Sequence, residues 1–165
     1  MVIFVMGLPG TGKTYFAKAL AEKLNVVHVN SDITRHEMNM RGKYDMESRR
    51  LVYQEMQKRM YDVLLSGRNV VVDATFYNSS IRDNFFSLVS SFKSDQSIVL
   101  MTASDETIHK RMSSTRPDSE ADYQTYLKLK AMFQLIKEDH LVLPSDQLQL
   151  NEMIEKTIQH FNLKG

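Results

Sequence analysis

The chain has 165 residues, of which 42% are hydrophobic and 25% charged, a balance typical of one soluble globular domain with its own core. A net charge of +1 argues against binding of bulk nucleic acid, and no apolar run approaches a membrane span. Cysteine is absent, which excludes disulfides and thiolate metal sites and fits the cytoplasm. We therefore expect a single cytoplasmic domain over residues 1–165, whose oligomeric state the sequence leaves open.

Short apolar runs recur along the chain with helical patterns between them. These runs predict strands over residues 2–6, 26–29, 69–74, 97–102 and 141–143. Several are continuous rather than alternating, which is typical of strands covered on both faces. Since strand and helix alternate throughout, the sequence predicts an α/β fold with a mostly parallel, doubly wound sheet.

Apolar residues at helical spacing and capping residues mark the segments between the strands. We predict helices over residues 13–24, 33–39, 46–66, about 79–92, from 105 onward, from about 119 onward through Ile136, and about 146–161. Expected caps are Ser31 or Asp32, Asn78 or Ser79, and Ser104.

The stretch G-L-P-G-T-G-K-T fits the phosphate-binding pattern G-x-x-x-x-G-K-[ST] at every fixed position. Glycines let the backbone N–H groups approach a triphosphate, the following helix adds its positive end, the lysine adds a charge and the threonine hydroxyl can bind Mg²⁺. A dinucleotide fold is the alternative, but the glycines do not form G-x-G-x-x-G. We therefore expect ATP and Mg²⁺ to bind here, at Gly7, Pro9, Gly10, Thr11, Gly12, Lys13 and Thr14.

Two acids follow predicted strands at the edge where open α/β sheets bind ligands. Asp32 can accept a proton from an acceptor hydroxyl, and Arg35 can hold an anionic acceptor. The alternative is that Asp32 only caps a helix. Asp73 ends an apolar strand, as expected of an acid that orients Mg²⁺, and Thr75 and Arg82 follow on the acceptor side unless Arg82 is a plain surface residue.

A basic segment predicts a lid over roughly residues 105–125. Arg111 is expected at the nucleotide, and Arg116, which precedes a proline, is expected to stabilise the charge that develops during transfer. The alternative is a solvated connector between two helices. Tyr44, Arg49 and Arg50 lie in a polar stretch, and we predict that they face water rather than an acceptor.

The order of G-L-P-G-T-G-K-T, N-S-D-I-T-R, V-V-V-D-A-T and a two-arginine segment resembles the small P-loop kinases of the adenylate-kinase-like group. The resemblance is greatest to the kinase domain of 5′-polynucleotide kinases and related small ATP-binding proteins. It covers roughly residues 1–140. It implies a three-layer αβα P-loop NTPase fold, with five parallel strands in the order 2-3-1-4-5 and a helical lid. It also implies roles for Asp32 as general base, Arg35 as acceptor contact, Asp73 as the third-strand acid and Arg116 as lid arginine.

The sequence therefore predicts an ATP-dependent kinase with a hydroxyl acceptor, in which Lys13, Asp32 and Arg116 are catalytic. The acceptor is a small metabolite or a nucleic-acid 5′ end. Near-neutral charge favours the metabolite, as does Ile33 after Asp32, where polynucleotide kinases often have a second acid. The alternative is a nucleotide-gated binding module or slow ATPase that acts through a protein partner. GTP is less favoured because no N-K-x-D-like guanine reader appears.

Overall fold

A five-stranded parallel sheet forms the middle layer of the protein. The structure, a computed structural model, describes residues 1–113 and 123–163. The strand order is β2-β3-β1-β4-β5 and all four pairings are parallel, so the expected sheet and order are confirmed. The strands are β1 (Val2–Met6), β2 (Val27–Asn30), β3 (Val70–Asp73), β4 (Gln96–Thr102) and β5 (Leu141–Pro144).

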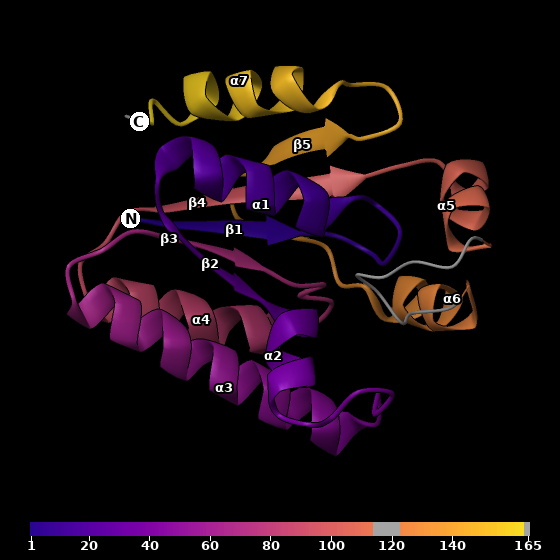
Figure 1. The fold of residues 1–165 in the computed structure, drawn as a ribbon, viewed down its shortest axis with the longest axis horizontal. Helices are drawn as coiled ribbons and strands as arrows, with labels where there is room; N and C mark the ends of the chain where they lie inside the picture. The colour runs from indigo at the N-terminus through magenta and orange to yellow at the C-terminus, as the bar shows by residue number, and fades with distance from the viewer. Residues whose placement is uncertain (114–122, 164–165) are drawn as a thin grey trace.

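Helices cover both faces of this sheet and its carboxyl edge. They are α1 (Lys13–Leu24), α2 (Ser31–Glu37), α3 (Met46–Leu65), α4 (Ser79–Ser91), α5 (Asp105–Met112), α6 (Tyr123–Met132) and α7 (Leu150–His160). In Figure 1, α1 and α7 lie on one face of the sheet and α3 and α4 on the other, while α5 and α6 lie beyond the ends of the strand arrows. Among the described helices, none is both long and apolar enough to cross a lipid bilayer.

The central strand explains the continuous apolar runs. Val2, Phe4 and Met6 of β1 belong to the core shared with α3 and α4, whereas Ile3 and Val5 belong to the core shared with α1 and α7. All five side chains are fully buried. Because successive residues of a strand point to opposite faces, a strand covered on both sides needs no polar positions.

One predicted cap is wrong, and its correction matters for the site. Asn78 and Ser104 cap α4 and α5 as expected. At α2, however, the cap is Asn30, whose side chain accepts hydrogen bonds from the backbone N–H groups of Asp32 and Ile33. Strand β2 runs directly into α2 without a loop, so the last strand residue occupies the capping position. The Asp32 side chain is therefore not the cap.

Three helices also differ from the prediction by more than one residue at a boundary, and the first of them, α2, spans Ser31–Glu37 rather than residues 33–39. Helix α6 ends at Met132, so Phe133 and Ile136 lie beyond it, and its predicted start falls outside the described residues. Helix α7 begins at Leu150 rather than near Asp146. The preceding residues form a turn in which Gln147 and Leu148 donate to the carbonyl of Pro144, and the Asp146 carboxylate accepts from the backbone of Ser104 at 2.8 Å.

Candidate active site

The glycine-rich segment forms a tight loop between β1 and α1. Gly7 has a φ of 143°, and a Cβ there would lie 2.4 Å from the carbonyl oxygen of Met101. Gly10 has a φ of 87°. The loop is closed internally at Leu8, whose carbonyl accepts from Thr11 Oγ1 at 2.8 Å and from Lys13 Nζ at 3.2 Å. A loop without side chains in its bend, followed by the start of α1, fits a cradle for phosphate oxygens.

Oxygen-bearing side chains meet beside this loop. Asn30 and Asp73 are register partners on β2 and β3, and Asn30 Nδ2 donates to Asp73 Oδ2 at 2.6 Å and to Thr14 Oγ1 at 3.2 Å. His28 Nε2 lies 3.5 Å from the same Asp73 oxygen. The other oxygen, Oδ1, is buried and has no hydrogen-bond partner within the described part of the chain. A buried carboxylate oxygen beside a hydroxyl is a donor set that fits Mg²⁺ or one of its waters.

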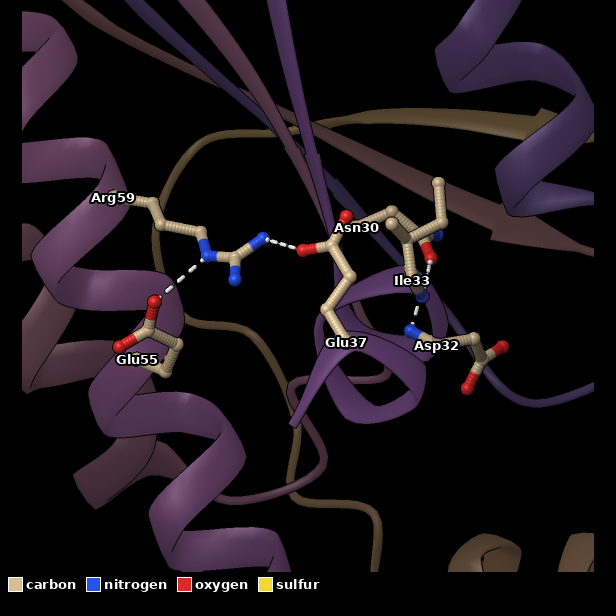
Figure 2. A network of polar contacts seen from close by, with 6 residues as sticks. All are labelled: Asn30, Asp32, Ile33, Glu37, Glu55 and Arg59. Carbon is tan, nitrogen blue, oxygen red and sulfur yellow. Dashed lines mark hydrogen bonds and ion pairs between the residues drawn. The ribbon is translucent and has the colours of Figure 1, made fainter. Parts of the chain in front are cut away.

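Helix α2, which carries Asp32, is held at both ends (Figure 2). At its start, Asn30 Oδ1 accepts from the backbone of Asp32 at 2.9 Å. At its end, Glu37 pairs with Arg59 of α3, and Arg59 Nε also donates to Glu55 at 2.9 Å. The helix is therefore fixed to β2 by a cap and to α3 by an ion-pair network.

One cavity, here called the central cavity, collects most of the predicted site residues. Its volume is about 260 Å³. The predicted residues that line it are Pro9, Gly10, Gly12, Lys13, Thr14, Asp32, Arg35, Asp73 and Thr75. The phosphate loop, the start of α2 and the end of β3 thus converge on one space.

The cavity also contains residues that the sequence reasoning missed. Tyr44 and Arg49 line it together with Tyr53 and Tyr77, so the prediction that Tyr44 and Arg49 face water is wrong. Of the three residues predicted to face water, only Arg50 is exposed, and its side chain pairs with Glu47. Arg49 lies three residues before buried Val52 on α3, so the helical period of the apolar stripe could have identified it.

Several predicted residues lie elsewhere. Gly7 and Thr11 shape the loop without lining the cavity. Arg111 braces the loop from outside, because its Nη1 donates to the Gly10 carbonyl at 3.2 Å and its Nη2 to the Ser145 carbonyl at 3.0 Å. Arg116 falls outside the described residues, as does the middle of the predicted lid.

Arg82 is neither a surface residue nor a lining residue of the central cavity. Its side chain is 2% exposed, and its guanidinium donates to the carbonyls of Phe76 at 2.9 Å, Gln134 at 3.1 Å and Leu135 at 2.8 Å. Burial lowers the pKa of this guanidinium. Arg82 was predicted to contact the acceptor, but its guanidinium instead binds three backbone carbonyls outside the central cavity.

Comparison with known proteins identifies kinases among the similar chains. A cytidylate kinase of Methanocaldococcus jannaschii is 34% identical over 80 residues, which span 44% of this chain and 44% of that relative, less than half of each. A sugar kinase structure from Janibacter has a TM-score of 0.76 at 18% identity and covers 98% of this chain and 94% of its own. The Mycobacterium tuberculosis APS kinase in complex with AMPPNP and APS has a TM-score of 0.74 at 19% identity, with 98% and 97% covered.

Both structures share the P-loop kinase fold with this chain. At 18% and 19% identity, this likeness describes the fold alone. The family model described as AAA domain matches residues 2–136, which include the phosphate loop, α2, Asp73 and α6. This match spans well over half of the chain, and the protein therefore belongs to the AAA domain family.

Proposed function

We propose that the protein is an ATP-dependent kinase that transfers the γ-phosphoryl group to a hydroxyl of a small metabolite. The observation that carries the proposal is the position of Asp32, a carboxylate that lines the same cavity as Lys13 and Thr14. A binding module has no need of a proton acceptor beside the phosphate loop, and an ATPase, which would use one on water, has no need of Arg35 beside that carboxylate. A kinase needs such a carboxylate there to accept the hydroxyl proton.

In the proposed reaction, Asp32 accepts the proton of the acceptor hydroxyl as its oxygen bonds to the γ-phosphorus. The bond from that phosphorus to the leaving oxygen of ADP breaks, so the products are a phosphate ester, ADP and a proton. Lys13 and the N–H groups of the loop stabilise charge on the phosphate oxygens. Thr14 and, through a water, Asp73 would hold Mg²⁺, and the ion would neutralise phosphate charge when bound. Arg116 is proposed as the lid arginine, and Arg111 as a residue that supports nucleotide binding.

A nucleic-acid 5′ hydroxyl is the second candidate acceptor. Asp32, Arg35 and Tyr44 line not only the central cavity but also a neighbouring cavity of about 1210 Å³ along α1 and α2. Lys18 and Arg41 contribute positive charge to this second space, and Glu22 and Glu37 contribute negative charge. It offers room for the remainder of a larger acceptor whose hydroxyl enters the central cavity.

The test is transfer of labelled γ-phosphate to a panel of sugars, hydroxy acids, nucleosides, their phosphates and oligonucleotide 5′ ends. Asp32→Asn is expected to lower the turnover number about 10²- to 10⁴-fold, the usual contribution of a general base, with unchanged affinity for an ATP analogue. Asp62→Asn, at an exposed position on α3, is the matched control. An Asp32→Asn enzyme as fast as the wild type rules out the base assignment, and nucleotide binding without transfer to any acceptor rules out the kinase.

A further inference from the structure

We infer that the acceptor carries an oxyanion group, such as a phosphate, sulfate or carboxylate, in addition to the reacting hydroxyl, and that Arg35 and Arg49 bind this group. The inference rests on the proposed function, because it takes the central cavity as the acceptor site. It names a substrate class, hydroxylated anions, and excludes neutral sugars and nucleosides as preferred acceptors.

Arg35 is a buried cation whose hydrogen-bonding capacity is only partly used. Its side chain is 7% exposed, and Nη1 donates to the carbonyl of Lys43 at 2.6 Å. Its Nε is buried and has no hydrogen-bond partner within residues 1–113 and 123–163, and no carboxylate in these ranges forms an ion pair with it. An unpaired buried guanidinium is unfavourable unless an anion joins it. Arg35 lines both the central cavity and the neighbouring one, but Arg49 lines only the central cavity, so the anion is expected there.

Arg49 places a second guanidinium at the same cavity. It is half-buried on the first turn of α3, and no ion pair joins it to a carboxylate in the described part of the chain. The adjacent Arg50 is the contrast, because it is exposed and its Nε donates to Glu47 at 3.0 Å. Of two neighbouring arginines, the one with a carboxylate partner faces solvent and the one without lines the cavity.

Tyrosine rings support both guanidinium groups. Arg35 Cζ lies 4.5 Å from the centre of the Tyr44 ring, and Arg49 Cζ lies 5.7 Å from that of Tyr77. Contact with a ring face orients a guanidinium without using its in-plane N–H donors. A planar fork of donors held in this way matches the oxygens of a phosphate or carboxylate. The tyrosines therefore prepare the arginines for an oxyanion.

The first experiment measures anion binding without a known acceptor. The phosphate loop is saturated with Mg²⁺ and AMPPNP, so that added inorganic phosphate cannot bind there, and phosphate is titrated calorimetrically at constant ionic strength. Wild type is expected to bind phosphate, and Arg35→Met and Arg49→Met are each expected to weaken binding at least about tenfold, the loss expected for one charge-assisted hydrogen bond. Arg50→Met is the matched control, one position away on the same helix, and should bind as wild type does.

Absence of phosphate binding in the wild type overturns the inference. It is also overturned if Arg35→Met and Arg49→Met bind phosphate as tightly as the control Arg50→Met does. Because Arg35 is buried, affinity for Mg²⁺–AMPPNP and the melting temperature are measured for each variant. Arg35→Lys and Arg49→Lys keep the charge without the planar fork, and recovery of part of the lost affinity supports the anion subsite. If Arg35→Met fails to fold, Arg49→Met alone decides the outcome.

The second experiment separates this inference from the kinase assignment. Each neutral acceptor is compared with its phosphorylated or carboxylated counterpart, and Arg49→Met should raise the KM for the anionic member at least about tenfold with little change in kcat, as expected for binding that is uniform along the reaction. Equal transfer to both members overturns the inference and leaves the kinase intact. Arginine-dependent phosphate binding without transfer to any acceptor supports the subsite and overturns the kinase.

Discussion

At the scale of single residues, Asn30 joins the parts of the site. Its amide nitrogen donates to Asp73 and to Thr14, and its amide oxygen accepts from the backbone of Asp32 and Ile33. The side chain is 3% exposed. One buried amide therefore orients the two predicted Mg²⁺ ligands and also begins the helix that carries the predicted base. We regard it as a positioning residue, since it acts through these neighbours.

Asn30→Ser tests this role, because serine still caps a helix but cannot donate to Thr14 and Asp73 together. The Mg²⁺ concentration for half-maximal binding of a fluorescent ATP analogue should rise about 10- to 100-fold, the usual cost of removing a residue that orients metal ligands. Asn78→Ser is the control, since Asn78 likewise caps α4 by accepting from Ser80 and Ile81. The same Mg²⁺ dependence in both variants would show that Asn30 is only a cap.

Residues such as Asn30 mark the limit of what the sequence could predict about the site. The phosphate loop was found by its glycine-rich motif, and Asp32 and Asp73 were found because each lies at or just after the end of a strand that a local apolar pattern reveals. The role of Asn30 depends on Asp73, which is 43 positions away, and on the register of β2 with β3. That register is a tertiary property, and no local period encodes it.

At the scale of elements, helices α5 and α6 are joined by one acidic side chain. The Asp105 carboxylate accepts from Tyr126 Oη at 2.6 Å and from Lys130 Nζ at 2.7 Å. The hydrogen bond from Lys130, followed by that from Tyr126, lowers the pKa of Asp105 from its ordinary value of 3.8. Asp105 therefore joins the two described helices that lie on either side of the undescribed part of the predicted lid.

Asp105→Asn should lower stability in a pH-dependent way. A carboxyl group whose pKa is lowered on folding stabilises the protein above its unfolded pKa, and this contribution is lost as the pH falls through the folded pKa. The wild type should therefore exceed Asp105→Asn in the free energy of unfolding at pH 7, and the difference should shrink below about pH 4. Urea unfolding at pH 7, 5 and 3 measures this difference in the free energy of unfolding. A difference that stays constant over this range would contradict the ionic contact.

The bounds of the strands and helices show where local sequence patterns are sufficient for prediction. Each predicted strand end lies within one residue of the observed one, and α1 has the predicted bounds, because β strands and α1 bury a continuous or strictly periodic apolar surface. The start of α7 was placed too early, at Asp146. That carboxylate accepts a hydrogen bond from Ser104, on a segment 42 positions away, and a contact of this kind leaves no trace in the local pattern.

At the scale of the whole molecule, buried Arg82 connects segments that are distant in sequence. The residues after α6 contact the loop between β3 and α4, where Gln134 donates to the Tyr77 carbonyl at 2.8 Å and Ser79 donates to Gln134 Oε1 at 2.7 Å. The Arg82 guanidinium binds carbonyls of both segments. Since Tyr77 lines the central cavity, and α6 contributes Leu129 to it, Arg82 holds two walls of that cavity together.

Arg82→Met should destabilise the protein by about 3 kcal/mol, because three carbonyls lose a charged donor while the burial of the cation is relieved. Arg82→Lys keeps the charge, but an ammonium group does not reproduce the planar fork, so an intermediate loss is expected. Hydrogen exchange should show faster exchange of the Gln134 amide in both variants, whereas amides of β1 should change only as far as global stability falls.

Arg68→Met is the control, since Arg68 is exposed and donates to Ser66 two residues away. If Arg82→Met unfolds at the same urea concentration as Arg68→Met and the Gln134 amide stays protected, the walls of the cavity are held together by other contacts.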